Sequence, residues 1–204
     1  MASNRPNWDS AYLNKPAETL SWFENQPSVS VALMAKAGLE KDDAIVDVGA
    51  GASPVLVALA KDGFGDLTAI ELSGAALETL QNRLPAGAQV DTVIADICAW
   101  QPKRHYDLWH DRAVLHFLTE TADRAAYVAT LNAALPPGGH AVIGAFAPDG
   151  PDKCFGQPIQ KYDAESLMAL LGQEFVLIEE RRHTHVTPGG TEQRYFYALV
   201  QRQE

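Results

Sequence analysis

One acidic residue and two glycines follow each other at short spacing near the end of an apolar run, in the order Asp47, Gly49 and Gly51. The apolar residues before and after the acid are typical of a parallel strand that is buried on both faces. The two glycines allow a sharp turn and let the backbone approach a ligand closely. Ser53 suits the N-cap of a following helix. The segment 44–54 therefore predicts a ligand site at the carboxyl end of a parallel strand.

The charge pattern of this turn favours a cationic ligand group over a pyrophosphate. A dinucleotide-binding loop has a third glycine where this chain has Pro54, and proline removes an N–H group from the helix end. The turn carries no basic residue, whereas Asp47 supplies a negative charge that suits an ammonium group. A nicotinamide-dependent oxidoreductase stays an alternative, which Pro54 opposes.

Two further acids stand where the second and third expected strands end, Glu71 and Asp96, and each precedes an apolar residue, Leu72 and Ile97. Ionised carboxylates only accept hydrogen bonds, so Asp47 suits an ammonium group and Glu71 suits a pair of ribose hydroxyls. Solvated strand ends and ordinary turns are the alternative interpretation of each acid taken alone.

With these acids in place, the chain resembles the class I S-adenosylmethionine (SAM)-dependent methyltransferases, whose first motif has the form [D/E]-x-G-x-G. The resemblance covers residues 44–202. It implies that SAM is the cofactor and S-adenosylhomocysteine the product. It also implies a cofactor site made of Asp47, Gly49, Gly51, Ser53, Glu71, Leu72, Asp96, Ile97 and Trp22.

The segment 106–115 lies where these enzymes place the residues around the transferred methyl group. Its Asp111–Arg112 pair resembles a pair in thiol and thiopurine methyltransferases and in small protein-lysine methyltransferases. We expect His110 and Asp111 to be the catalytic residues, with His110 as a general base. The alternative is that His110 only bonds a backbone group and that Asp111 pairs with Arg112 or positions the loop.

Residues 1–26 contain more aromatic side chains than a plain tail, namely Trp8, Tyr12, Trp22 and Phe23. We expect this N-terminal segment to act as a lid that excludes water from the active site, with core packing as the alternative. The segment around Trp22 also resembles a bacterial subgroup of these methyltransferases. Residues 27–204 then form the SAM-binding domain.

Helical and strand patterns alternate over residues 44–146, which predicts a parallel α/β sheet with right-handed crossovers. Two β-rich segments, 175–183 and 193–201, flank a Pro-Gly-Gly turn and predict a hairpin. The resemblance implies a single Rossmann-like class I methyltransferase domain with a seven-stranded, mostly parallel sheet and a C-terminal antiparallel hairpin. The other expected elements are strands at 44–48, 67–72, 90–94, 106–110 and 140–146, helices at 27–37, 54–62, 73–84, 121–135 and 163–172, and a long loop at 147–162.

The net charge and the apolar content of the chain limit the classes of molecule that it could bind. The chain has 204 residues and a net charge of −10, so nonspecific binding to nucleic acid or to anionic membrane is disfavoured. We expect no membrane association and a cytoplasmic location, since no apolar leader or 18-residue apolar run is found and the two cysteines, Cys98 and Cys154, are too few for a disulfide framework. His183 and His185 share a strand face but have no third ligand in sequence, so we expect no metal site.

The sequence thus predicts a methyltransferase that acts on a small-molecule acceptor, such as a thiol or a polar metabolite. A protein lysine is the alternative acceptor, suggested by the Asp111–Arg112 resemblance and the acidic composition. A non-catalytic SAM-binding module is the alternative from another class.

Overall fold

The computed structural model describes residues 7–203 and contains one seven-stranded sheet in the order β3-β2-β1-β4-β5-β9-β8. The first five strands of the chain pair in parallel, and β9 runs antiparallel to both β5 and β8. The predicted mostly parallel sheet with a C-terminal hairpin is therefore confirmed. The strands are β1 (Ala44–Val48), β2 (Asp66–Glu71), β3 (Asp91–Ile94), β4 (Leu108–Arg112), β5 (His140–Phe146), β8 (Phe175–Val186) and β9 (Glu192–Arg202).

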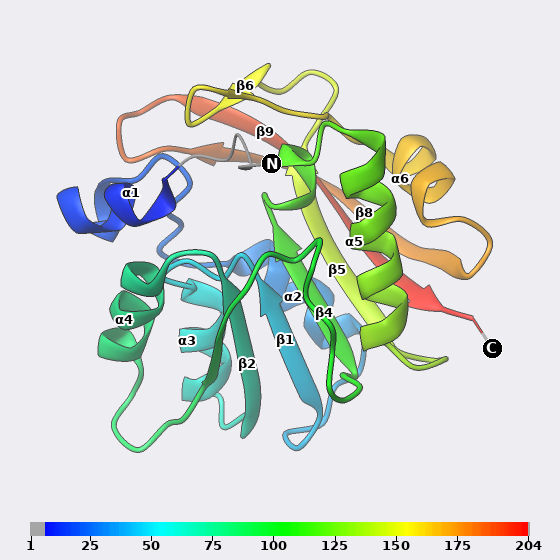
Figure 1. Ribbon diagram of the computed structural model, residues 1–204, viewed down its shortest axis with the longest axis horizontal. Coiled ribbons are helices and arrows are strands. Elements are labelled where there is room, and N and C mark those ends of the chain that lie inside the picture. The colour runs from blue at the N-terminus through cyan, green and yellow to red at the C-terminus, as the bar shows by residue number, and fades with distance from the viewer. Residues whose placement is uncertain (1–6, 204) are drawn as a thin grey trace.

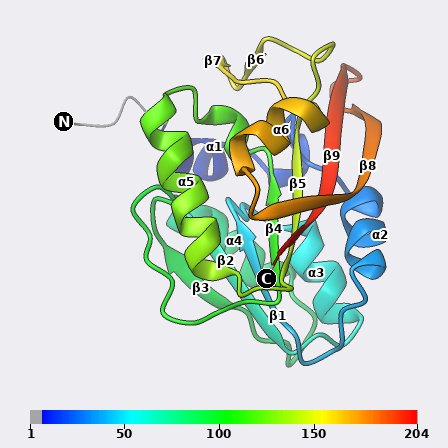
Figure 2. The same cartoon turned by 90° about the vertical axis from the view of Figure 1, so that its right-hand side faces the viewer.

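Helices cover both faces of the sheet and form a three-layer arrangement (Figures 1 and 2). One face packs against α2 (Ser28–Lys36), α3 (Pro54–Lys61) and α4 (Gly74–Arg83). The other face packs against α5 (Thr121–Ala134) and α6 (Ala164–Leu171). The apolar positions of these helices recur at helical spacing, and burying them supplies the main favourable term for folding.

Strand alternation decides which helical layer each polar side chain of the central strands meets. In β1, Val46 belongs to the core beneath α5, whereas Ile45 belongs to the core beneath α2 and α3. Asp47 has the parity of Ile45 and pairs in register with His110 of β4. These two side chains therefore meet in the α2–α3 layer.

Two small elements rise above the carboxyl ends of the parallel strands (Figure 1). One is the N-terminal helix α1 (Trp8–Asn14), followed by a 3-10 turn, η1 (Ala17–Thr19). The other is a hairpin of β6 (Lys153–Cys154) and β7 (Gln157–Pro158), within the segment predicted as a loop. Its tip residues Phe155 and Gly156 both have positive φ, 49° and 74°, as a tight turn requires.

The structure shifts one strand relative to the prediction, because β4 spans Leu108–Arg112 rather than 106–110. Asp107 lies before this strand and holds the first residue of β1, because its carboxylate accepts the Ala44 N–H at 2.8 Å. The first six residues of the predicted N-terminal segment, and residue 204, lie outside the described residues.

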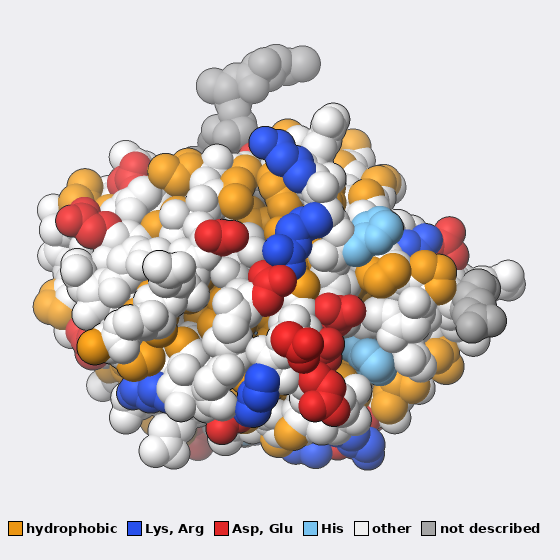
Figure 3. Space-filling model, turned by 90° about the horizontal axis from the view of Figure 1, so that it is seen from below, with side chains coloured by type: hydrophobic (Ala, Val, Ile, Leu, Met, Phe, Trp, Pro, Cys, Tyr) orange, Lys and Arg blue, Asp and Glu red, His pale blue; other side chains and the backbone are white. Residues whose placement is uncertain are grey.

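The surface carries a mixed charge pattern. On the face seen in Figure 3, acidic side chains gather near the middle and basic ones are scattered around them, so the described residues present no broad basic patch there. Among residues 7–203, no helix has both the length and the apolar character needed to cross a membrane.

Candidate active site

The glycine turn has the conformation that its sequence predicts. Gly49 and Gly51 have φ values of 62° and 56°, in the left-handed region that favours glycine. A Cβ on Gly49 would lie 2.0 Å from Val114 Cγ2, and one on Gly51 would lie 2.3 Å from Tyr12 Oη. Neither position has room for a side chain, because other parts of the chain approach the bare backbone closely.

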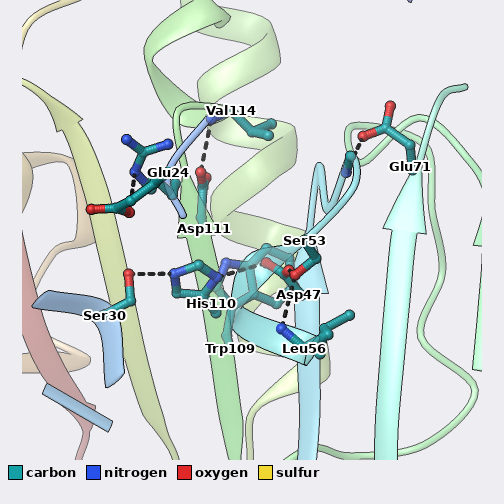
Figure 4. A network of polar contacts seen from close by, with 12 residues as sticks. Glu24, Ser30, Asp47, Ser53, Leu56, Glu71, Trp109, His110, Asp111 and Val114 are labelled. Carbon is teal, nitrogen blue, oxygen red and sulfur yellow. Dashed lines mark hydrogen bonds and ion pairs between the residues drawn. The ribbon is translucent and has the colours of Figure 1, made fainter. Parts of the chain in front are cut away.

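A buried polar network anchors the turn from below (Figure 4). Ser53 caps α3, since its Oγ accepts the Leu56 N–H at 3.0 Å while its hydroxyl donates to Asp47 Oδ2. The other carboxylate oxygen of Asp47 lies 2.6 Å from His110 Nδ1. His110 Nε2 lies 2.9 Å from Ser30 Oγ on α2. The predicted cap at Ser53 is thus confirmed, and it is linked directly to the predicted acid.

His110 lies beneath the turn rather than open to solvent, because its exposed fraction is only 2%. With Asp47 accepting from Nδ1–H and the Ser30 hydroxyl donating to Nε2, a neutral imidazole has both ring nitrogens occupied. A general base needs a free nitrogen facing the acceptor. The geometry instead gives His110 the position of a group that orients Asp47.

Asp111 points to the opposite side of the sheet and is fully buried. Its carboxylate accepts the N–H groups of Val114 at 2.8 Å and Leu115 at 3.0 Å, and the hydroxyl of Tyr127 at 2.7 Å. Burial raises the pKa of Asp111 to about 6, against these hydrogen bonds, which lower it. The expectation that Asp111 borders the acceptor does not fit this placement, since strand alternation directs it into the α5 layer, where it anchors the turn after β4.

Glu71 ends β2 beside the glycine turn and has an exposed fraction of 8%. Oε2 accepts the Gly51 N–H at 2.9 Å, and Oε1 accepts the N–H groups of Leu72 at 2.7 Å and Ser73 at 3.1 Å. Burial raises the pKa of Glu71, although the three backbone donors oppose that shift. The carboxylate is held rigidly, and Oε2, which accepts only one N–H group, keeps a lone pair for the donors of a ligand.

A cavity of about 520 Å³ connects the glycine turn with the ends of β2, β3 and β4. Four of the residues expected to bind the cofactor line it, namely Gly49, Glu71, Leu72 and Ile97. Asp96 lies between the lining residues Ala95 and Ile97, and its Oδ1 accepts the Cys98 N–H at 3.0 Å in a tight turn. The structure thus brings the acids of the first three strands to one edge of the sheet.

A smaller cavity of about 60 Å³ lies on the α2–α3 side of the same turn, bordered by Asp47, Ser53 and His110. Tyr12 and Trp22 line both cavities and are joined by a hydrogen bond of 3.2 Å from Trp22 Nε1 to Tyr12 Oη. Burial and the neighbouring Glu71 charge raise the pKa of Tyr12, so it stays a neutral phenol.

Aromatic rings from three distant segments form the roof of the larger cavity. Trp8 of α1 stacks on Phe155 of the β6–β7 hairpin with ring centroids 5.3 Å apart. Trp8 also meets Trp22 at 5.8 Å and Phe117 at 5.2 Å, both edge to face. Phe23, by contrast, packs beneath the guanidinium of Arg83 outside this roof. Phe23 instead lines the smaller cavity, so each of the four N-terminal aromatic residues borders one of the two cavities.

Arg112 is the basic residue at the junction of the two cavities. Its Nη1 donates to the Trp22 carbonyl at 2.7 Å, and its Nε donates to Tyr197 Oη at 2.9 Å and lies 3.4 Å from Glu24 Oε2. The next residue, Ala113, has φ of 75°, a strained value for a non-glycine residue and one often associated with functional sites.

Sequence reasoning did not assign Arg112 to the site, and it placed Tyr12 only in the expected lid. Tyr12 belongs to the aromatic N-terminal segment, so the available signal was its composition. Arg112 entered the sequence analysis only as the neighbour of Asp111. The face of the sheet on which its side chain lies depends on where β4 begins, and the sequence did not predict that position correctly. His183 and His185 lie on β8, and the described residues contain no cluster that could hold a metal ion.

The topology and the site geometry together give the fold of the class I methyltransferases. Residues 45–139 match the sequence profile of a family described as the methyltransferase domain. Comparison with curated protein sequences finds no match to this chain.

Solved structures of methyltransferases share this fold over nearly the whole chain. The N-methyltransferase NodS from Bradyrhizobium japonicum, in complex with S-adenosylhomocysteine, has a TM-score of 0.73 at 20% identity, covering 98% of this chain and 100% of that chain. A 1,6-didemethyltoxoflavin N1-methyltransferase from Burkholderia thailandensis, with its acceptor and S-adenosylhomocysteine bound, has a TM-score of 0.68 at 20% identity, covering 95% and 81%. A structure described in connection with the conversion of a disulfide bond into a thioacetal group during echinomycin biosynthesis has a TM-score of 0.74 at 21% identity, covering 96% and 92%.

Proposed function

We propose that this chain is a SAM-dependent methyltransferase that acts on a small-molecule acceptor. The observation that carries the proposal is the position of Glu71 beside the glycine turn, in one cavity with Leu72 and Ile97. Solved neighbours with this fold have S-adenosylhomocysteine bound, and one of them holds a small heteroaromatic acceptor beside it.

Each part of SAM has a chemically matched group in the proposed site. The Glu71 carboxylate accepts the ribose hydroxyls, while Leu72 and Ile97 pack on the adenosine and Asp96 faces its amino group. The bare backbone of Gly49 and Gly51 passes beside the methionine portion. The charge of Asp47, oriented by Ser53 and His110, offsets the positive charge of the sulfonium and ammonium groups.

Methyl transfer breaks the bond between the sulfonium sulfur and the methyl carbon and forms a bond from the acceptor atom to that carbon. The bonding electrons stay on sulfur, which becomes the thioether of S-adenosylhomocysteine, and any acceptor proton leaves to solvent. Alignment of the two reactants and exclusion of water supply much of the rate. The aromatic roof of Trp8, Trp22 and Phe117 serves that exclusion.

Transfer of a labelled methyl group from SAM to fractionated cell extract tests the proposal. We expect label in the fraction below a size cut-off and none in the protein fraction. Label on protein would favour a lysine acceptor instead. SAM binding with no transfer to either fraction would indicate a non-catalytic SAM-binding module.

A further inference from the structure

Among the described residues, buried polar atoms without a hydrogen-bond partner lie at the end of the larger cavity below the β6–β7 hairpin and in the core next to it. Arg112 and Cys154 line this end, with Gln157 and Pro158 of the hairpin. Tyr195 of β9 and His116, which are both 0% exposed, are not lining residues of this cavity, and the Tyr195 ring lies against the Arg112 guanidinium. Within the described part of the chain, Arg112 Nη2, Tyr195 Oη and both ring nitrogens of His116 are buried without a hydrogen-bond partner.

The contacts place these groups around one another. The Arg112 guanidinium lies over the Tyr195 ring, with its carbon 4.7 Å from the centroid. Phe146 joins Tyr195 and His116, at centroid distances of 4.8 Å to each. Burial and the Arg112 charge lower the pKa of His116 to about 3, so its imidazole is neutral and offers one N–H donor.

Two of the three guanidinium nitrogens of Arg112 have polar partners. Nη1 and Nε are bonded to Trp22, Tyr197 and Glu24, and both Trp22 and Glu24 line the smaller cavity. Nη2 is the edge left over, and the Arg112 charge acts on Cys154, His116 and Tyr195. A buried N–H of a charged group without an acceptor is strongly unfavourable, so this edge calls for a hydrogen-bond acceptor, of which a carboxylate is the strongest.

The larger cavity has acidic side chains at one end and a basic side chain at the other. Glu71, Glu120 and Asp123 line it beside the residues proposed to hold adenosine. Of the described residues that line the hairpin end, Arg112 is the charged one. Trp8, Trp22 and Phe117 supply flat apolar walls between these two ends.

We infer that the methyl acceptor is a small acid with a flat apolar body, whose carboxylate binds to Nη2 of Arg112 below the hairpin. The unpartnered hydroxyl of Tyr195, whose ring contacts the Arg112 guanidinium, is the further donor to that carboxylate. This inference rests on the proposed function, since it names the class of acceptor for the same site. It disfavours a lysine acceptor, because an ammonium group would meet the Arg112 cation.

Binding of model compounds to protein saturated with S-adenosylhomocysteine tests this inference without turnover. Benzoate, benzamide and benzylamine share a ring and differ in charge, and each is titrated at constant ionic strength while the melting temperature is measured. We expect benzoate alone to raise the melting temperature, by roughly 3–5 °C at ten times its dissociation constant. An equal rise with benzamide, or a rise with benzylamine alone, would overturn the inference.

Two variants locate the carboxylate. Tyr195→Phe removes a hydroxyl that bonds to nothing in the protein, so we expect an unchanged melting temperature without benzoate and a smaller benzoate shift. Tyr162→Phe is the matched control, because the Tyr162 hydroxyl is also buried without a partner but belongs to the core on the other face of the sheet. Equal benzoate shifts in the wild type and the Tyr195 variant would remove Tyr195 from the site.

Arg112→Gln separates the acceptor from the cofactor. We expect this variant to lose the benzoate shift and to keep its preference for S-adenosylhomocysteine over methylthioadenosine, which lacks the amino-acid carboxylate. Loss of that preference would assign Arg112 to the cofactor and overturn the inference. If S-adenosylhomocysteine binds but no methyl transfer is found while benzoate binds as expected, the proposed function fails and the anion site stands.

Discussion

At the scale of single residues, the site depends on carboxylates that are already fixed by the protein before a ligand arrives. Glu71 is held by three backbone N–H groups, and Asp47 is held between Ser53 and His110. Such groups keep their orientation without reorganisation when a cationic or hydroxyl-bearing ligand binds. Replacing one of them therefore affects both the fold of the turn and the affinity for the ligand.

Glu71→Gln keeps one oxygen acceptor and removes the charge. We expect the affinity for SAM to fall by about 1.5–3 kcal/mol, the scale of hydrogen bonds to charged groups, as measured by titration calorimetry. Glu71→Ala should in addition lower the free energy of unfolding by roughly 1–3 kcal/mol, because buried backbone donors lose their acceptor. Unchanged affinity in the Gln variant would place the ribose elsewhere.

His110→Ala distinguishes a positioning role from general-base catalysis. Because His110 holds Asp47, we expect weaker SAM binding and a less stable fold, with kcat at saturating SAM within a few-fold of the wild type. A general base would contribute roughly a hundredfold or more to kcat. Ser30→Ala is the companion variant, since it removes the other partner of His110 and should shift SAM affinity in the same direction. A large loss of kcat with intact SAM affinity would restore the general base.

Asp111 gives the stability a distinct pH dependence. Its pKa is about 6 in the folded chain against 3.8 for an ordinary Asp, so the unfolded chain loses this proton first as the pH rises. The contribution of Asp111 is therefore greatest below about pH 4 and is lost as the pH rises through about 6. Relative to Asp111→Asn, we expect the wild type to lose roughly 3 kcal/mol of unfolding free energy over this range, measured by urea unfolding. A difference in unfolding free energy between the two proteins that stays constant with pH would contradict the raised pKa of Asp111.

At the scale of elements, local signals in the sequence predicted much of the chain. The Ser53–Pro54 cap, the bounds of β5 and the Asp163 cap of α6 follow from short-range chemistry and are confirmed. The predicted start of β4 lies two residues before the observed one. The observed position of β4 places His110 and Asp111 next to each other within the strand, so their side chains point to opposite helical layers. Register depends on pairing with β1 and β5, which lie far apart in sequence, so local patterns did not reveal it.

The short elements α1 and the β6–β7 hairpin were not predicted because neither has an apolar period of its own. Each is stabilised by the other through Trp8 and Phe155, which are separated by most of the chain. Helix α1 also docks on α4, where Asp9 Oδ1 accepts the Ser73 hydroxyl at 2.6 Å. The roof is therefore a tertiary assembly, and we expect it to respond to changes on either side.

Trp8→Ala tests whether this roof retains the cofactor. The variant removes ring contacts to Trp22, Phe117 and Phe155, so we expect faster dissociation of S-adenosylhomocysteine by about tenfold and faster hydrogen exchange in the hairpin. Leu13→Ala is the matched control on the same helix, because Leu13 is 72% exposed. Equal dissociation rates in the two variants would show that α1 does not act as a lid.

At the scale of the whole molecule, the central claim is that the carboxyl edge of this sheet binds SAM rather than a dinucleotide. Asp47, Glu71 and Asp96 concentrate negative charge along that edge, and the glycine turn leads into a proline instead of a third glycine. This arrangement suits a cationic cofactor and disfavours a pyrophosphate.

Thermal unfolding with S-adenosylhomocysteine, NAD and NADP in parallel tests that claim most directly. Ligand binding to the folded chain alone stabilises it by about 2.7 kcal/mol at one hundred times the dissociation constant. For a chain of this length that corresponds to a rise of roughly 5–10 °C in melting temperature. We predict this rise with S-adenosylhomocysteine and none with NAD or NADP. A rise with NAD or NADP and none with S-adenosylhomocysteine would contradict the account.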